Sequence, residues 1–448
     1  MHSNIQYSQI SRDKLLYISS IIFADDIASG RPCKIIDDFI SQHIYPFYSN
    51  THSNATCGIK MRNYIKYTRS IIKKHYGVSN IDNYKILFCG NGATSSVNHM
   101  ISMLKKQNFF ASPTIIYLSI NEHYSNHLPW KETNNCIIKI IPHNEDTTIN
   151  FDQFEKMLTN DQNEYIPHKL GFIKNQNHSI IVSVTACSNV TGIFSDINHL
   201  ISLKMKFHFI LAIDYACSAP YKKITVNNVD FCFVSGHKFL GGPSSPGLLI
   251  FNNDLFHGYT KPCYPGGGCV AKYSDDIVSY SKDIETLESA GSPNVVGIIR
   301  FGLCIHLQSL LYDFIQLREH EIVNIIDSYI NDHKPSNLHF ISPINPSLQR
   351  LPIYSCIIDD VHYNFIVVLM NDIFNIQTRG GISCCGMLSE HLKLKGWCRI
   401  SFNYLFTNEM IKYIMDSLFY IANNYTNYIN MYIYDENTNL FTRKSLVH

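Results

Sequence analysis

Seven short apolar runs between residues 85 and 252 constrain the fold more than any other feature of this sequence. The runs are Lys85–Cys89, Thr114–Leu118, Cys136–Ile141, Ser179–Val184, His208–Ile213, Phe231–Val234 and Gly247–Phe251. Segments of helix length, or turns containing Gly and Asn, separate them. Such runs are typical of strands buried on both faces of a sheet. We therefore predict an α/β fold with a mostly parallel, seven-stranded sheet flanked by helices.

The pattern changes after residue 295. Two long helices are predicted there, Val295–Leu311 and Ile315–Ile330, followed by a proline-rich connection over 335–352. A chain of 448 residues is long for one ordinary domain. We therefore predict a second, smaller α+β domain in the C-terminal part.

The composition excludes several classes of function. The 37 Lys and Arg against 36 Asp and Glu give a net charge of +1, which creates no general field for nucleic acid or anionic lipid. No apolar run approaches the roughly eighteen residues of a membrane span, and the N-terminus lacks the pattern of a signal or transit peptide. We expect a cytoplasmic protein without nucleic-acid or membrane partners. The fourteen cysteines contain no C-x-x-C pair, so we expect mostly reduced thiols and no metal site.

One lysine occupies an unusual place. Lys238 follows the strand that ends at Val234 and lies in a loop of Gly, Ser and Pro before the next strand. Most lysines are solvated surface residues, but burial at a strand end lowers the pKa of the amine and favours Schiff-base chemistry. Lys238 is therefore the candidate for the covalent attachment of pyridoxal 5'-phosphate.

That cofactor has further requirements, and residues at other strand ends meet them. Asp214 closes a strand and would pair with the pyridine nitrogen, while His123 would stack on the ring and Asn189 would contact the ring oxygen. Gly90–Thr94 precedes a predicted helix, Ser95–Lys105, whose N-terminus would hold the phosphate. Each signal alone also fits an ordinary cap or turn, so the prediction depends on their occurring together.

The chain resembles class V aminotransferase-type enzymes of pyridoxal-phosphate fold type I, and most of all their cysteine desulfurase and selenocysteine lyase branch. The matching segments are Tyr48–His52, Gly92–Thr94, Glu122–His123 with Pro129–Trp130, Ser188–Gly192, Asp214, Ser235–Lys238, Pro265–Gly268, Leu287–Asn294, Arg379–Gly381 and Gly396–Arg399. The resemblance implies an N-terminal arm over 1–51 that contributes to the small domain, a large domain over 52–310 and a small domain over 311–448. It also implies a homodimer.

The resemblance assigns roles to further residues. The phosphate would be held by Ala93, Thr94, Ser235 and His237, together with Ser292 of the other subunit. Asn189 and Cys217 would lie near the ring oxygen, although glutamine is common at the position of Cys217. The substrate would contact Asn50, His52, Arg379 and Arg399. The two arginines would bind its carboxylate, because a planar guanidinium suits a carboxylate.

The resemblance also suggests a reaction. Cys384 lies five residues after Arg379, where the desulfurase branch has its nucleophilic cysteine. With Lys238 and His123 as the other catalytic residues, L-cysteine would become L-alanine and sulfur would pass to a persulfide on Cys384, and then to an acceptor protein. The alternatives are a buried, structural Cys384 in another class V enzyme (an aminotransferase, a selenocysteine lyase or a C–S lyase) or a non-catalytic homologue. Ile382 and Cys385 depart from the family pattern and leave the substrate open.

Overall fold

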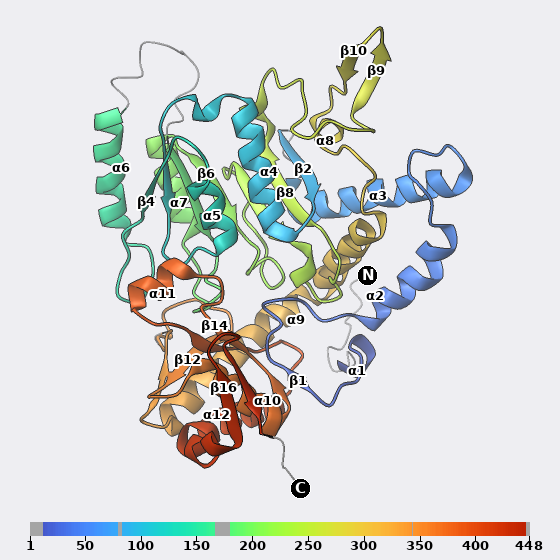
Figure 1. Cartoon of the computed structure of the whole chain (residues 1–448). Helices are drawn as coiled ribbons and strands as arrows, with labels where there is room; N and C mark the ends of the chain where they lie inside the picture. Colours follow the sequence, from blue (N-terminus) through green and yellow to red (C-terminus); the bar gives the residue numbers. More distant parts are fainter. Residues whose placement is uncertain (1–11, 79–82, 166–179, 343, 445–448) are drawn as a thin grey trace. The chain divides into compact units, whose positions relative to one another are not determined.

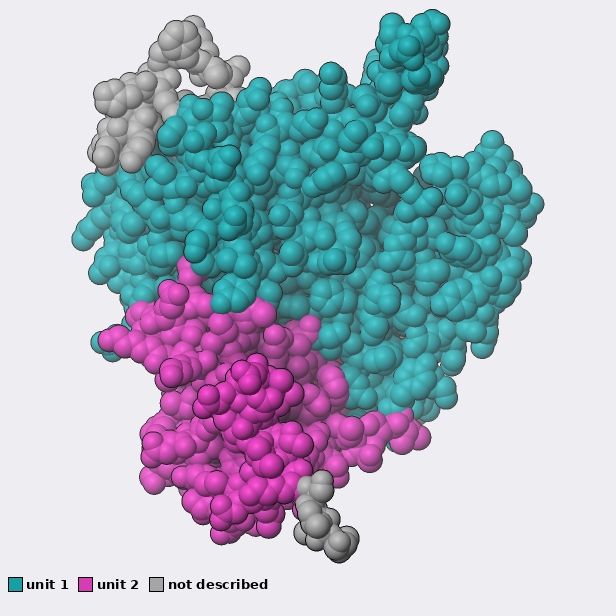
Figure 2. Space-filling view, in the orientation of Figure 1, with its two compact units in different colours: residues 1–17, 29–186, 195–312 teal, residues 18–28, 187–194, 313–448 magenta. Residues whose placement is uncertain are grey.

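The computed structural model describes residues 12–78, 83–165, 180–342 and 344–444 (Figure 1). By its internal contacts the chain divides into two units, coloured teal and magenta in Figure 2. The first unit comprises residues 1–17, 29–186 and 195–312, and the second comprises 18–28, 187–194 and 313–448. Of the predicted N-terminal arm, only residues 18–28 belong to the second unit in this division. The short segment 187–194 also belongs to the second unit.

The first unit contains a seven-stranded sheet, which confirms the predicted fold class. Its strands are β2 (Tyr84–Cys89), β3 (Thr114–Leu118), β4 (Cys136–Ile140), β5 (Ile180–Thr185), β6 (Ile210–Asp214), β7 (Phe231–Ser235) and β8 (Gly247–Asn252). Every predicted run overlaps one of these strands, although Ser179 lies outside the described residues. All residues of β3, β5, β6 and β7 are buried, as uniformly apolar runs require.

The strand directions bring several strand ends to one edge. The order is β2-β8-β7-β6-β5-β3-β4, and β8 alone runs antiparallel to its two neighbours. The remaining strands therefore all point the same way, and their carboxyl ends share one edge of the sheet. The segments that follow β2, β3, β6 and β7 all begin at this edge.

Helices and a hairpin complete the first unit. The helices are α1 (Arg12–Leu15), α2 (Lys34–Phe39), α3 (Thr56–His75), α4 (Gly92–Lys106), α5 (Tyr124–Lys131), α6 (Phe151–Tyr165), α7 (Ile197–Phe207) and α8 (Ile284–Leu287). The apolar side chains of α4 recur at helical spacing and are buried, because this helix packs against β2, β7 and β8. The hairpin of β9 (Val270–Ser274) and β10 (Ile277–Tyr280) is largely exposed.

One helix replaces the two that the sequence predicts after residue 295. Helix α9 spans Val295–His333, 39 residues without interruption, because residues 312–314 contain neither Gly nor Pro to end a helix. The prediction of two helices is therefore wrong. Among the described helices, α9 alone is long and apolar enough to cross a membrane, but more than half of its most apolar window is buried, as in the core helix of a globular fold.

The second unit is an α+β structure. Its four-stranded sheet has the order β11 (Leu338–Phe340), β12 (Ile353–Ile358), β15 (Trp397–Ser401) and β14 (Arg379–Gly381). The core contains apolar side chains from α9, α10 (Tyr363–Phe374), α12 (Asn408–Asn424) and the sheet. Strand β1 (Ile22–Phe23) pairs with β13 (Ile376–Gln377), and the unit also contains α11 (Gly386–Leu392) and a hairpin of β16 (Tyr432–Asp435) and β17 (Leu440–Arg443).

Candidate active site

Lys238 lies at the carboxyl edge of the sheet, in a single helical turn, Gly236–Lys238, that follows β7 directly. The turn fits there because Gly236 has no side chain: a Cβ would lie 2.5 Å from the carbonyl oxygen of Pro246. Lys238 is half-buried. Burial lowers the pKa of His237 and the charge of Lys238 adds to that effect, whereas at Asp214 burial raises the pKa and the charge of Lys238 opposes the rise. The amine therefore lies within electrostatic reach of the two residues that the sequence places with it.

Asp214 is the last residue of β6 and is 3% exposed. Burial raises the pKa of its carboxyl group, whereas the Ala216 N–H, which donates to Oδ1 at 2.8 Å, and the charge of Lys238 oppose that rise. A cation that approached this carboxylate would stabilise the ionised form further. The position therefore suits a protonated ring nitrogen.

Glu122 is a part of the site to which sequence reasoning assigned no role of its own. Its fully buried carboxylate accepts hydrogen bonds from Ser119 Oγ at 2.6 Å, the Thr185 N–H at 2.8 Å and Asn126 Nδ2 at 2.7 Å. Burial raises the pKa of Glu122 to about 7, and the charge of Asp214 contributes to the rise. The carboxylate thus ties the segment after β3 to the end of β5, where Thr185 pairs with Asp214.

The imidazole of His123 caps helix α5. Its Nδ1 accepts the Ser125 N–H at 3.1 Å and lies 2.9 Å from Ser125 Oγ, which in turn is 2.6 Å from Thr94 Oγ1. Because Nδ1 is an acceptor, the proton of a neutral ring is on Nε2. This network joins His123 to the start of α4. Its stacking on a cofactor ring stays a prediction.

The start of α4 forms an anion cradle with β7. Gly92 has φ +63°, and a Cβ there would lie 2.6 Å from His237 Cε1 and 2.9 Å from Ser235 Oγ, so only glycine leaves this space open. The Ala93 N–H donates to Ser235 Oγ at 2.9 Å. Burial lowers the pKa of His237 to about 4, so the imidazole is a neutral hydrogen-bond donor. A space lined by a helix N-terminus and a hydroxyl fits a phosphate group, and Asp214 and Lys238 emerge from neighbouring strands. These residues therefore fit pyridoxal phosphate.

Other predicted residues lie elsewhere in the first unit. His52 and Ser292 are exposed and line a cavity of about 1000 Å³ together with Cys89, His99 and Glu288. Asn50 is also exposed, and its Oδ1 accepts the His52 N–H at 2.8 Å. Cys217 is buried three residues after Asp214. The predicted roles of these four residues stay predictions.

The second unit gathers the predicted arginines. Arg379 and Arg399 are direct cross-strand partners on β14 and β15, so their side chains leave the same face of the sheet. Arg399 is 1% exposed; its Nη2 donates to Asp25 Oδ1 at 2.7 Å and its Nη1 to the Asn189 carbonyl oxygen at 3.1 Å. The buried Nε of Arg399 has no hydrogen-bond partner within the part of the chain that the structure describes. Two guanidinium groups against one carboxylate leave a net positive charge, which suits a carboxylate ligand.

Cys384 lies in an unusual turn after β14. Ser383 and Cys384 both have positive φ, 53° and 57°, and the Cys385 N–H closes the turn on the Ile382 carbonyl oxygen at 2.9 Å. Residues other than glycine seldom adopt this conformation, which costs roughly 1 kcal/mol or more for each. The Cys384 sulfur is half-buried and lies 3.5 Å from Arg379 Nη2.

Two hydrogen bonds hold that turn. Trp397 Nε1 donates to Ser383 Oγ at 3.1 Å, and Asn189 Nδ2 donates to the Ser383 carbonyl oxygen at 2.8 Å. The hydrogen bond from Asn189 to Ser383 gives Asn189 a structural role that the sequence did not indicate. A side-chain amide has two N–H donors, so its predicted contact with the ring oxygen stays a prediction.

Comparison with known proteins identifies the family of the chain. The sequence model of the family described as aminotransferase class-V matches residues 22–414, and the chain belongs to that family. The prediction of a class V enzyme is thereby confirmed. The positions that carry the resemblance, from Tyr48–His52 to Gly396–Arg399, all lie within the match.

Two relatives and two solved structures that the chain matches are named cysteine desulfurases or probable cysteine desulfurases. The chain is 25% identical over 403 residues to a probable cysteine desulfurase of Borreliella burgdorferi, with 87% of this chain and 89% of the relative covered. It is 24% identical over 403 residues to a probable cysteine desulfurase of Halalkalibacterium halodurans, with 88% and 91% covered. The apo cysteine desulfurase of Thermococcus onnurineus has the same fold, with a TM-score of 0.78 at 19% identity and 90% and 95% covered. The cysteine desulfurase CsdA of Escherichia coli does so with a TM-score of 0.74 at 19% identity, with 91% and 96% covered.

Proposed function

We propose that this chain is a pyridoxal-phosphate-dependent cysteine desulfurase, which converts L-cysteine to L-alanine and transfers the sulfur to Cys384. The observation that carries the proposal is the placement of the Cys384 sulfur 3.5 Å from the Arg379 guanidinium, in a turn held by Trp397 and Asn189. Arg379 Nη2 donates to this sulfur and so orients it, and the thiolate is the nucleophilic form of cysteine. The relatives named cysteine desulfurase support the same reading.

The cofactor assignment follows from the carboxyl edge of the sheet. Gly92–Thr94, Ser235 and His237 would hold the phosphate, Asp214 the ring nitrogen and Lys238 the aldehyde carbon. When bound, pyridoxal phosphate supplies an electron sink that permits loss of the Cα proton and cleavage of the Cβ–S bond. His123 would cover the ring and assist proton transfer at the substrate sulfur.

The protein residues perform the remaining work. Lys238 takes the proton from Cα and returns a proton to the product, while Arg399 binds the substrate carboxylate. The Cys384 thiolate attacks the substrate sulfur, so that an S–S bond forms as the Cβ–S bond breaks. The electron pair of the broken bond stays with the substrate carbon, which takes a proton and becomes alanine. One thiol and one cysteine thus give one persulfide and one alanine.

The test measures alanine and sulfide from L-cysteine in the presence of a reducing thiol. We expect both products from the wild type and from Cys57→Ala, which removes another half-buried cysteine, in α3. The Cys384→Ala variant should yield neither. Alanine from both the wild type and Cys384→Ala would refute the persulfide route and favour a selenocysteine-lyase-like reaction. Absence of product from a wild type that binds the cofactor would refute cysteine as the substrate.

We further propose that the protein is a cytoplasmic homodimer that passes its sulfur to an acceptor protein. Ser292 lies exposed on the cavity of the first unit, where the phosphate of the partner's cofactor would reach it. Sedimentation of the holoenzyme tests the assembly: a monomer at micromolar concentration would refute it. A Ser292→Ala variant should stay dimeric and bind the cofactor more weakly.

A further inference from the structure

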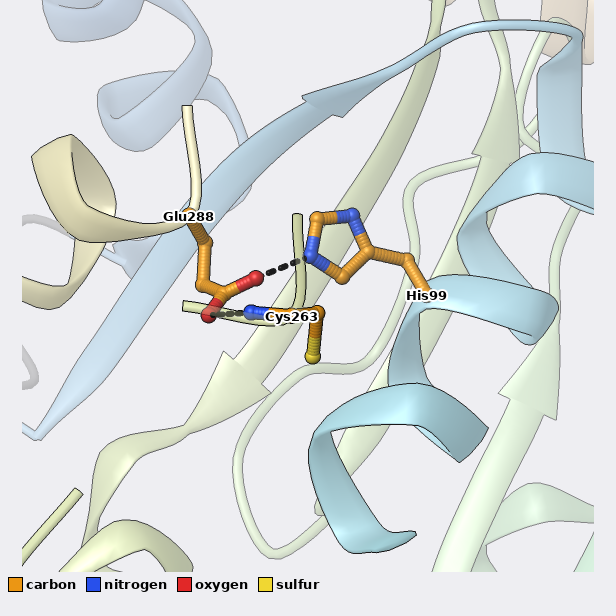
Figure 3. A group of neighbouring side chains, drawn as sticks. All are labelled: His99, Cys263 and Glu288. Carbon is orange, nitrogen blue, oxygen red and sulfur yellow. Dashed lines mark hydrogen bonds and ion pairs between the residues drawn. The ribbon is translucent and has the colours of Figure 1, made fainter. Parts of the chain in front are cut away.

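A second cluster of reactive side chains lies in the first unit, apart from the residues that would hold the cofactor. It comprises His99 from α4, Cys263 from the loop after β8 and Glu288 directly after α8. The imidazole nitrogen, the thiol sulfur and a carboxylate oxygen all lie within 4.8 Å of one another. Figure 3 shows His99 and Glu288 pointing toward each other, with His99 Nε2 2.6 Å from Glu288 Oε2. Nitrogen, sulfur and oxygen ligands in one place form the donor set that zinc takes in proteins.

Each member of the cluster is oriented by a second contact. His99 Nδ1 lies 3.8 Å from Cys89 Sγ, so the outer nitrogen has a partner and Nε2 faces Glu288. The other oxygen of Glu288, Oε1, accepts the Tyr259 hydroxyl at 2.7 Å and the Cys263 N–H at 2.9 Å. The same Tyr259 hydroxyl is 3.1 Å from Cys263 Sγ. Outer contacts of this kind fix the ligands of metal sites.

We propose that His99 Nε2, Cys263 Sγ and Glu288 Oε2 form a binding site for a divalent transition-metal ion, with Zn²⁺ as the best match. Tetrahedral zinc bonds place such ligand atoms about 3.4–3.6 Å apart. The ion would replace the proton shared by His99 and Glu288 and separate these two atoms by roughly 0.8 Å beyond their present contact.

The fourth position of the ion would face the cavity of the first unit. His99 and Glu288 line the cavity of about 1000 Å³, so an ion could enter from it and keep a water molecule or a small ligand. The ion would join three segments of the first unit: α4, the loop that leads to Pro265–Gly268, and the segment that leads to Ser292. A bound ion would therefore stabilise these three segments of the cavity wall, whether or not the protein is a desulfurase.

Metal analysis of the full-length holoenzyme provides the test. The protein is stripped with a chelator, loaded with Zn²⁺, passed through a desalting column and analysed for bound metal. We expect about one ion per chain in the wild type and a loss of more than about 100-fold in affinity in His99→Ala and Cys263→Ala, because these variants lose a ligand and not an outer contact. The matched controls are Cys136→Ala and His143→Ala. Cys136 lies on β4, at the edge of the sheet opposite β2, and His143 follows it, and both variants should keep the ion.

Two further measurements distinguish a site from a folding defect. Loading with Co²⁺ should give intense visible bands of tetrahedral thiolate coordination in the wild type and in Cys136→Ala, but not in Cys263→Ala. Cys89→Ala removes only the outer partner of His99 and should lower the affinity about 10- to 100-fold without abolishing binding. Circular dichroism and cofactor absorbance should stay at wild-type values in every variant used. A wild type that retains no ion, or a His99→Ala/Cys263→Ala double variant that retains as much as the wild type, would overturn the proposal.

Discussion

Gly92→Ala tests the anion cradle more directly than any change to a charged residue. Gly92 has φ +63°, which costs an L-residue roughly 1–2 kcal/mol. The new Cβ would also lie 2.6 Å from His237 Cε1 and 2.9 Å from Ser235 Oγ, and crowding of this kind in a packed site costs roughly 1–3 kcal/mol. Together these contributions predict a loss of about 2–5 kcal/mol in the free energy of unfolding.

Gly77→Ala separates the two contributions. Gly77 has φ +71°, but a Cβ there would meet nothing within 4 Å. The two substitutions therefore share the cost of the backbone conformation and the smaller entropy of the unfolded chain, and these cancel in the comparison. The remaining difference of roughly 1–3 kcal/mol measures the crowding at His237 and Ser235.

The assay has two readouts. Urea unfolding of the cofactor-free protein gives the stability difference, and titration with pyridoxal phosphate, followed by its absorbance, gives the affinity. We expect Gly92→Ala to bind the cofactor at least tenfold more weakly and Gly77→Ala to bind it as the wild type does. Equal stability and equal cofactor affinity in the two variants would refute the cradle at Gly92.

Three further changes test other parts of the site. Burial raises the pKa of Glu122 from 4.5 to about 7, so protonated Glu122 stabilises the fold fully below pH 4.5. As the pH rises to 7, the free energy of unfolding should fall by roughly 3 kcal/mol. Glu122→Gln should flatten this pH dependence in urea unfolding curves, and an unchanged dependence would contradict the assignment. Arg399→Ala should weaken the binding of amino acids by roughly 2–5 kcal/mol in spectral titrations. It should also destabilise the fold, because Asp25 loses its ion pair. An affinity equal to that of the wild type would remove Arg399 from the substrate site. Trp397→Phe removes the donor to Ser383, so we expect a loss of about 1 kcal/mol of stability and slower sulfur transfer; unchanged kinetics would show that the turn needs no such support.

The sheet was predictable because its signal is local. Runs such as Thr114–Leu118 are mostly apolar and buried at every position, and burial on both faces is the usual reason for an apolar run without alternation. The helix after β2 was also predictable, but the sequence placed its start at Ser95 and the structure places it at Gly92. A glycine with positive φ opens this helix, and propensity alone favours Ser over Gly as a first residue. The predicted start of the helix is therefore wrong by three residues, at the turn that forms the anion cradle.

Among the candidate site residues, Lys238 and Asp214 have the most direct signals in the sequence, although the prediction of a site depends on several signals together. Lys238 and Asp214 each follow an apolar strand, so position and chemistry coincide in a few residues of sequence. Asp25 and Ser383 gave no such signal, because their importance comes from tertiary contacts. Asp25 binds Arg399 across 374 residues of chain, and Ser383 accepts from Trp397 across 14 residues that include a helix. The structure supplies these partners.

The proposed metal site of His99, Cys263 and Glu288 shows the same limit. Zinc sites are recognised in sequences by short, regular ligand spacings, which arise when one turn or one helix face supplies two ligands. Here His99 and Glu288 are 189 residues apart, and Cys263 and Glu288 are 25 apart, so no pair has such a spacing. The sequence-based expectation of no metal site therefore excluded only sites built from local ligand pairs. A site assembled from three segments depends on the packing of α4 against β2 and β8, and a fold that brings these segments together creates the donor set without any motif.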